Sequence, residues 1–493
     1  MNLEAKIVSN IRSSLLCVYL LILLSGLFIV PVTSQHQASP KLVVITHAAV
    51  VDLRSGQLHE NQSIVIKAEH ITVVGESDGV VIPKDAQVID GSGKYIIPGL
   101  WDAHVHLSYL GACALPVFVA NGVTSVRDCG AQLEDIAMWQ KQIAEGKLIG
   151  PRIKTPGPNL ESKEWLERAW KVLPSSDEAW RLGPRREVVN AEQAASVVDS
   201  LAASRVDFIK FRNLPHPSFM AVMAEAKRQG LPVAGHAPKG TSLVEASEAG
   251  MKSIEHAETI MLALGSLSDE ERLQSFQVLA RNHTLITPTL ITDVAAHLTS
   301  DKDALAIVAD TNGARDVRRK YVAPQTLRLW QHGIELKKKF EEDDDWQTLY
   351  LKEVEVLRLA HRAGVQMMTG TDEGSIAGLY PGFSVHDELE LLVKEVGLTP
   401  LEALQTAIVY PPTFFGSQSE FGLIQPGRLA DLVLLDANPL TDIRNTRRIR
   451  TVVINGKVLQ RANLDAMLAD VANAVGKRAG CAVEKREPDS EHR

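Results

Sequence analysis

Several short hydrophobic runs in this chain each end in a side chain that can bind a metal ion, and this repetition constrains the fold most strongly. The first run leads into His104 and His106, which share one face of a strand because they are two residues apart. The other potential ligands each end a later run: Lys210, His236, His256 and Asp372. Ligands so scattered can converge in a (β/α)8 barrel, where the C-terminal ends of all strands meet on one face. The pattern therefore predicts an α/β fold of the TIM-barrel class.

Eight barrel strands can be assigned from the hydrophobic runs and the turn residues between them. They place the potential ligands at the ends of the first, fourth, fifth, sixth and eighth strands. The expected ranges are 95–104, 122–128, 151–156, 206–211, 231–236, 252–256, 284–289 and 365–371.

Lys210 ends the apolar run 206–209, where a bare ammonium would be costly to bury. Its amine must therefore be exposed, paired or chemically modified. Taken alone, a lysine at a strand end most simply extends its amine to solvent. The other potential ligands favour modification instead.

The ligand motifs resemble those of the amidohydrolase superfamily, and the resemblance covers nearly the whole chain after its N-terminal segment. The most similar branch contains imidazolonepropionase-like enzymes and metal-dependent Xaa-Pro dipeptidases. The segments that carry the resemblance are His104-Val105-His106 after Pro98-Gly99, then Asp207-Phe208-Ile209-Lys210, Gly235-His236, Ile254-Glu255-His256, Gly370-Thr371-Asp372 and the closing stretch 422–433.

This resemblance implies a site for two divalent ions, with zinc as the expected metal, although manganese or cobalt would suit similar ligands. Lys210 would be N-carboxylated and would bridge both ions. The first ion would be held by His104, His106, Lys210 and Asp372, and the second by Lys210, His236 and His256. If Lys210 is unmodified, a single ion on His104, His106, His236 and Asp372 is the alternative.

The resemblance also implies a reaction, the hydrolysis of a C–N amide bond. A hydroxide bridging the ions would be the nucleophile. Asp372 would take its proton and deliver it to the leaving nitrogen as general base and acid. The expected substrate is a dipeptide or an N-acyl amino acid. Two alternatives remain open: hydrolysis of a cyclic amide, an imidazolone or a xenobiotic amide at a mononuclear site, and an inactive barrel that serves as a binding protein.

Four further side chains near the predicted ligands invite an interpretation. Arg212 is a candidate for binding a substrate carboxylate through two hydrogen bonds. His386 follows the last barrel strand, and it either lines the pocket mouth or belongs to a helix-capping segment. Asp102 and Glu255 are expected to form salt bridges outside the barrel.

The N-terminus carries an export signal in its composition. Lys6 and Arg12 precede an apolar run from Leu15 to Val30, which is short for a membrane span and typical of a signal-peptide core. We therefore expect a signal peptide at 1–34 and a secreted or periplasmic protein that starts at Gln35. The alternative is an uncleaved membrane anchor, the only membrane contact expected.

Alternating short strands on both sides of the barrel predict one composite β-sandwich, from 35–96 and 416–462. The barrel would occupy 97–415. Two stretches longer than ordinary barrel connections, 158–190 and 291–360, are candidate lids over the site, although packing for stability or dimer contact is equally consistent. Residues 463–493 are expected to form a helix and a disordered tail.

Charge and cysteine content add two expectations. The formal net charge of −8 gives no reason to expect nucleic-acid binding, and the expected partner is a small amide or peptide, with homo-oligomers left open. Cys113, Cys129 and Cys481 would remain after signal cleavage. Cys113 and Cys129 could pair, but single buried thiols are preferred.

Overall fold

The computed structural model describes residues 42–172, 183–340 and 345–477. The predicted signal peptide, 1–34, and the predicted disordered tail lie outside the described residues and remain predictions. Among the described residues, no helix combines the length and apolar character needed to cross a membrane.

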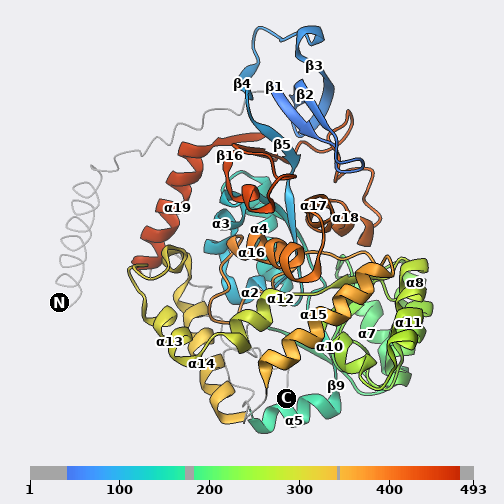
Figure 1. Ribbon diagram of the computed structural model, residues 1–493. Coiled ribbons are helices and arrows are strands. Elements are labelled where there is room, and N and C mark those ends of the chain that lie inside the picture. The colour runs from blue at the N-terminus through green and yellow to red at the C-terminus, as the bar shows by residue number, and fades with distance from the viewer. Residues whose placement is uncertain (1–41, 173–182, 341–344, 478–493) are drawn as a thin grey trace, which may run out of the picture. The chain divides into compact units, whose positions relative to one another are not determined.

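Both ends of the described chain join in one mixed sheet, which confirms that the two segments form one β unit. Its strands are connected in a single sheet, whereas the prediction was a β-sandwich. In Figure 1 the blue N-terminal strands and the red C-terminal strands lie together. The junction is β15, which runs antiparallel to β5 with Val433 opposite Ile97. The strands are β1 (Leu42–Val51), β2 (Leu58–Lys67), β3 (His70–Glu76), β4 (Gln87–Asp90), β5 (Tyr95–Pro98), β15 (Leu432–Leu435), β16 (Ile449–Ile454) and β17 (Lys457–Gln460).

The turn between β16 and β17 follows from its residues. Asn455 and Gly456 both have positive φ, 50° and 69°, which is the conformation of a two-residue hairpin turn. The strands pair antiparallel on either side of it. The hairpin expected at this position is confirmed.

The first predicted barrel strand, 95–104, is divided by Gly99 between two sheets. Residues before it form β5 in the composite sheet, and residues after it begin the barrel. A Cβ atom on Gly99 would lie 2.0 Å from Oγ1 of Thr124, so the barrel strand passes too closely for a side chain here. The domain boundary therefore lies inside one continuous apolar run.

The barrel strands form two parallel ladders that match the predicted positions. The third predicted strand, 151–156, contains only Arg152–Lys154, which pairs with Val123–Asp128, whereas the strand that pairs with Ile209–Phe211 is Asn159–Ser162, beyond the predicted range. The barrel strands are β6 (Leu100–Val105), β7 (Val123–Asp128), β8 (Arg152–Lys154), β9 (Asn159–Ser162), β11 (Ile209–Phe211), β12 (Val233–Gly235), β13 (Ser253–Glu255) and β14 (Leu285–Thr287), and β10 (Arg185–Val188) pairs with β9.

The eighth predicted strand, 365–371, is a segment held by separate hydrogen bonds rather than a regular strand. On one side Met368 donates its N–H to the carbonyl of Ile286 at 2.7 Å. On the other side Ala103 donates to the carbonyl of Thr369 at 2.8 Å. The segment thus lies between β14 and β6 and links the two ladders.

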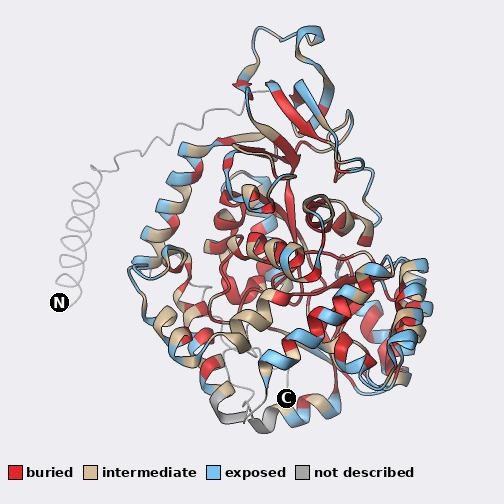
Figure 2. Ribbon diagram, in the orientation of Figure 1, coloured by how far each residue is buried: buried red, intermediate tan, exposed pale blue. Residues whose placement is uncertain are grey.

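Helices cover the strands and bury their outer side chains, as Figure 2 shows by the red on the central strands. The α/β fold class predicted above is thereby confirmed. The helices are α2 (Leu107–Leu110), α3 (Leu115–Ala120), α4 (Leu133–Ala144), α5 (Lys163–Val172), α7 (Ala191–Ala203), α8 (His216–Gln229), α9 (Leu243–Glu248), α10 (Ala257–Leu264), α11 (Asp269–Arg281), α12 (Leu290–Asp293), α13 (Asp301–Ala309), α14 (Pro324–Phe340), α15 (Trp346–Arg362), α16 (Phe383–Leu391), α17 (Pro400–Ile408), α18 (Tyr410–Phe414) and α19 (Arg461–Gly476).

The long stretch predicted as a candidate lid, 291–360, divides into two parts. Its last helix, α15, packs its buried face, which includes Val354 and Leu357, into the same core as the barrel strands. That helix is therefore part of the barrel wall. The preceding helix, α14, lies instead on the turn after His106, where Thr326 donates its hydroxyl to the carbonyl of Tyr109 at 2.8 Å.

The other candidate lid, 158–190, starts with β9 and α5 and returns through β10. Trp165 is described, whereas the side chain of Trp170 and all of Trp180 lie outside the described residues. Because β9 pairs with both β11 and β10, this segment extends the barrel wall instead of starting from a loose loop.

The cysteine expectation was wrong in one respect. Cys113 is disulfide-bonded, whereas Cys129 is a free and buried thiol. The two therefore do not pair with each other.

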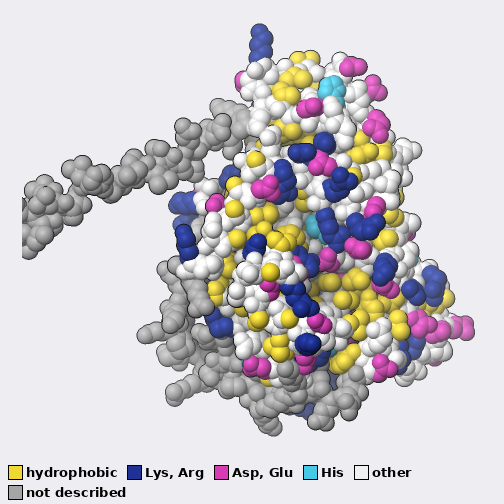
Figure 3. All heavy atoms as spheres, turned by 60° about the vertical axis from the view of Figure 1, so that its left-hand side comes forward, with side chains coloured by type: hydrophobic (Ala, Val, Ile, Leu, Met, Phe, Trp, Pro, Cys, Tyr) yellow, Lys and Arg dark blue, Asp and Glu magenta, His cyan; other side chains and the backbone are white. Residues whose placement is uncertain are grey.

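Charged side chains of both signs lie on the surface of the protein. On the face in Figure 3, basic and acidic side chains are interspersed, so that face carries no extended area of one sign.

Candidate metal centre

Five of the six predicted ligands gather at the C-terminal ends of the barrel strands. Potential ligand atoms of His104, His256 and Asp372 all lie within 4.8 Å of one another. His106 Nε2 lies 2.9 Å from Oδ1 of Asp372, and the ring of His236 lies 4.8 Å from the ring of His256. The structure thus brings together side chains that are up to 268 residues apart.

Two of these residues have backbone angles that ordinary strand residues do not adopt. His256 has φ 68° and Asp372 has φ 54°. Such angles cost a non-glycine residue about 1 kcal/mol or more and concentrate at functional sites. Both are held by backbone hydrogen bonds, from His256 N–H to Thr287 and from Asp372 N–H to His104.

Lys210, the sixth predicted ligand, lies on β11 and is 1 % exposed. Its Nζ atom is buried without a hydrogen-bond partner. Burial lowers the pKa of this amine, with Glu255 and Cys129 acting in the opposite direction. The reading in which the amine reaches solvent is therefore wrong, and a neutral or modified amine fits the surroundings.

The histidines are held in the form that binds metal. Burial lowers the pKa of His104 and of His236 well below the ordinary value, and the pKa of His256 to about 4. Burial acts against ionisation of Asp372, but the hydrogen bond from His106 holds its pKa far below the usual range. Neutral imidazoles around an ionised carboxylate are the donor set of a divalent metal.

Glu255 contacts His104 inside the barrel, contrary to the expectation that it forms salt bridges outside the barrel. Its Oε2 atom lies 2.7 Å from Nδ1 of His104 and 2.6 Å from Nη2 of Arg127. Burial opposes ionisation, but the charge of Arg127 and the hydrogen bond with His104 keep the pKa of Glu255 well below its ordinary value. The positive φ of His256 breaks the strand alternation, so Glu255 and the next residue both reach His104. A carboxylate on the outer nitrogen of a ligating histidine fixes its tautomer.

Asp102 is also internal, and its expected salt bridge outside the barrel was wrong. Its carboxylate accepts the hydroxyl of Thr371 at 2.6 Å and the backbone N–H of His104 at 3.1 Å. Burial raises its pKa to about 7. Asp102 thereby ties the first barrel strand to the segment that delivers Asp372.

Arg212, the first of the two substrate-binding candidates, lies near the histidines, and its charge lowers the pKa of both His236 and His256. Its Nε atom lies 3.5 Å from Oε1 of Glu161, and its guanidinium lies 5.2 Å from the centre of the Trp165 ring. Its side chain is 30 % exposed, so it remains accessible from solvent.

His386, the second candidate, does not line the pocket mouth. It is buried on α16, with Nδ1 2.9 Å from the Thr446 hydroxyl and Nε2 3.0 Å from the Asn121 carbonyl. Both ring nitrogens are therefore used to hold α16 against its neighbours. Its role is structural because neither nitrogen is left for a substrate.

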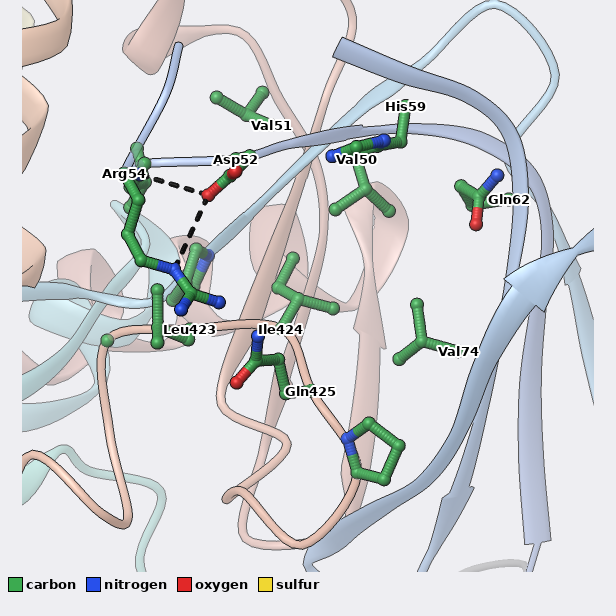
Figure 4. A pocket seen from close by; sticks show the side chains of 14 residues that line it. Val50, Val51, Asp52, Arg54, His59, Gln62, Val74, Leu423, Ile424 and Gln425 are labelled. Carbon is green, nitrogen blue, oxygen red and sulfur yellow. Dashed lines mark hydrogen bonds and ion pairs between the residues drawn. The ribbon is translucent and has the colours of Figure 1, made fainter. Parts of the chain in front are cut away.

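A separate cavity of about 290 Å³ lies in the composite domain, between β1, β2 and the return segment 422–426. Figure 4 shows a mixed lining of aliphatic and polar side chains around it, with Arg54 and Asp52 hydrogen-bonded at one side. None of the predicted ligands lines this cavity. It is thus distinct from the metal centre.

Two neighbouring carboxyl groups, the partly buried Asp293 and the buried Glu353, predict a pH dependence of stability. Burial and the neighbouring Glu353 raise the pKa of Asp293, at the end of α12, to about 9. The folded state then keeps a proton that the unfolded chain loses near pH 4, so this stability is full below pH 4 and is lost as pH rises towards 9. The free energy of unfolding of Asp293→Asn minus that of the unsubstituted protein should therefore be larger at pH 8.5 than at pH 5, by on the order of 2 kcal/mol.

Thermal unfolding of both proteins from pH 5 to pH 8.5 measures this difference. Asp470→Asn, on the exposed side of α19, is the matched control and should show no change in the difference with pH. If the difference in thermal stability between Asp293→Asn and the unsubstituted protein stays constant from pH 5 to pH 8.5, the two carboxyl groups do not share a buried proton.

The fold and the grouped side chains are those expected of a hydrolase with candidate ligands for a metal ion. Residues 95–459 match the family model described as the amidohydrolase family, so the chain belongs to that family. It is a hydrolase that acts on carbon–nitrogen bonds.

Individual relatives are distant but cover most of the chain. An ochratoxinase of Aspergillus niger is 24 % identical over 472 residues, which covers 84 % of this chain and 87 % of the relative. A prolidase crystallised with N-methylphosphonate-L-proline is 23 % identical, with a TM-score of 0.63 and coverage of 85 % and 100 %. A bottromycin amidohydrolase has a TM-score of 0.67 at 21 % identity, with coverage of 89 % and 91 %. At these identities the two structures support the fold alone.

Proposed function

We propose that this protein is an exported metal-dependent amidohydrolase that cleaves the amide bond of a dipeptide or an N-acyl amino acid. The observation that carries the proposal is the buried and unpartnered Nζ of Lys210, which lies among neutral histidines and an ionised aspartate. An isolated buried ammonium is unfavourable in such a place. A carboxylated lysine that binds two cations removes that cost.

The modification follows from the state of the amine. Because burial favours the neutral form, the nitrogen of Lys210 can attack carbon dioxide, forming a C–N bond and releasing one proton. The resulting carbamate has two oxygens and one negative charge. It can serve two cations, one with His104, His106 and Asp372 and one with His236 and His256. Two divalent ions, with zinc as the expected metal, would polarise the scissile carbonyl and lower the pKa of the attacking water.

The protein side chains then divide the remaining work. Asp372 takes the proton of the attacking water and delivers it to the leaving nitrogen. Glu255 and Arg127 hold His104 in one orientation from below. Arg212 offers a guanidinium on the solvent side of the histidines, where the carboxylate of the leaving amino acid would bind.

Two observations support the choice of substrate and compartment. The sequence relatives include an ochratoxinase, whose name refers to an ochratoxin. The disulfide at Cys113 is typical of an oxidising compartment, which agrees with the signal peptide expected at 1–34. A mononuclear site acting on cyclic amides, imidazolones or xenobiotic amides is the second candidate, and it applies if Lys210 is unmodified.

The test uses protein expressed from Gln35 onward, reconstituted with zinc and bicarbonate. Linear dipeptides and N-acyl amino acids are compared with cyclic amides, and released amino acids are measured by chromatography. Release from linear amides, abolished by a chelator and restored by metal, is the expected result. If linear amides are untouched while rings are opened, the mononuclear candidate replaces the proposal. Inertness towards both classes in a metal-loaded protein favours the binding-protein alternative.

A further inference from the structure

One buried carboxylate near the metal centre has an oxygen that nothing in the fold satisfies. Glu161 on β9 is fully buried. Its Oε2 atom accepts hydrogen bonds from the backbone and side-chain nitrogens of Asn213 at 3.3 and 3.4 Å. Its Oε1 atom is buried without a hydrogen-bond partner. Because an unmet buried acceptor is costly, such an atom marks a place where a donor can bind.

The strand register places this oxygen above the metal ligands. Leu160 pairs with Phe211, and both pack into the core outside the barrel. Alternate residues point the other way, so Glu161 and Lys210 face the barrel interior. Glu161 lies beyond Lys210 along the strand direction, one layer closer to the mouth. A substrate whose amide lies over the metal ligands would therefore pass beside Glu161.

Arg212 lies beside Glu161 in the same layer, but it does not satisfy it. The two side chains approach to 3.5 Å between Nε and Oε1, which is an ion pair without a hydrogen bond. Trp165 stacks near the guanidinium on the outer side and limits its movement. Arg185 on β10 also interacts electrostatically with both Glu161 and Arg212, so the layer holds one anion near two cations. A zwitterionic ligand can engage Glu161 with its cationic end and Arg212 with its anionic end.

We propose that Glu161 binds the free α-amino group of the substrate, so that the enzyme acts on dipeptides with a free N-terminus rather than on N-acyl amino acids. This inference rests on the proposed amide hydrolysis. The ammonium group takes the unsatisfied Oε1, and the carboxylate at the other end takes Arg212. The ion pair between Glu161 and Arg212, which has no hydrogen bond, is thereby replaced by two charge-assisted hydrogen bonds to the substrate. An N-acyl amino acid offers Arg212 its carboxylate but brings no cation to Glu161.

The test compares glycyl-phenylalanine with acetyl-phenylalanine, which differ only in the amino group. The unsubstituted protein should have a kcat/KM roughly 10- to 100-fold higher for the glycyl compound. Glu161→Gln should bring that value down to the acetyl level and leave acetyl-phenylalanine within about threefold. Glu164→Gln, an exposed carboxylate on α5, is the matched control and should change neither. The same comparison is made with glycyl-proline and acetyl-proline, and with glycyl-leucine and acetyl-leucine.

Two outcomes would overturn the inference. If Glu161→Gln lowers both substrates equally, Glu161 only holds Arg212 in place. If the unsubstituted protein prefers the acetyl compound, the site does not recognise an amine. If neither the glycyl nor the acetyl compound is cleaved, the proposed amide hydrolysis fails. The two compounds are then uncleaved ligands whose binding can be measured by calorimetry. Tighter binding of the glycyl compound that Glu161→Gln abolishes would then uphold the recognition, and equal binding would reject it.

Discussion

Asp372→Asn is expected to lower kcat by a factor on the order of 100 or more while the fold remains intact, because the variant keeps the size of the side chain but loses its basicity. Asp372 is the carboxylate that contacts both first-strand histidines, at 2.9 Å from His106 and 3.4 Å from His104. Its position at φ 54° is held by the backbone and does not depend on the charge. If Asp372 is both proton acceptor and proton donor, as proposed, the variant loses both steps at once.

The measurement is kcat on the best linear substrate, with thermal unfolding and metal content recorded on the same samples. Asp207→Asn is the matched control, because Asp207 pairs with Lys154 at 2.7 Å and lies before β11, at the other end of the strand. That control should keep most of its activity. Undiminished kcat in a metal-loaded, folded Asp372→Asn protein would remove Asp372 from proton transfer.

Lys210→Ala is expected to reduce the metal content from near two ions per chain to near one, with a fall in kcat on the order of 100-fold or more. A metal ion that stabilises charge in the transition state contributes several kcal/mol, and this variant removes the ligand that would bridge two of them. The truncation also leaves a space beside His104, Glu255 and Cys129, the groups that surround the amine. A small carboxylate such as propionate should enter that space and restore part of the second ion and of the activity.

Elemental analysis of protein prepared with bicarbonate provides the test, with and without propionate. Lys252→Ala is the control, since Lys252 is exposed directly before β13. A single ion in the unsubstituted protein, indifferent to Lys210, would point to the mononuclear alternative and to ring-opening substrates. Two ions retained by Lys210→Ala would show that another side chain bridges them.

The positions of the predicted ligands could be read from local pattern alone. Each lies at the end of a short apolar run, and parallel barrel strands place such ends on one face whatever the loop lengths between them. The hairpin at Asn455-Gly456 was equally local, since two residues specify the turn. The first apolar run was harder, because its division at Gly99 depends on the close approach of Thr124 from the next strand.

Some predictions were wrong because they used strand alternation to decide which face a side chain occupies, or used proximity in the sequence to decide its role. Glu255 was expected outside the barrel, but the positive φ of His256 lets consecutive residues contact the same histidine. His386 follows the last barrel segment, yet a loop carbonyl and Thr446 occupy both its nitrogens. The helix α15 looked like part of a lid because its polar face resembles a charged insertion, whereas its apolar face lies in the barrel core.

The sequence by itself determined the fold class, the composite sheet and the identity of the side chains that can bind metal, because these follow from hydrophobic spacing and residue chemistry. Only the tertiary structure decided which groups surround those side chains. The register of β9 against β11 places Glu161 one layer closer to the mouth than Lys210. Residues far apart in the sequence also become neighbours, such as His104 and Glu255, which are 151 positions apart. Such contacts depend on strand register and on a few unusual backbone angles, which many distant interactions set together and no local pattern encodes.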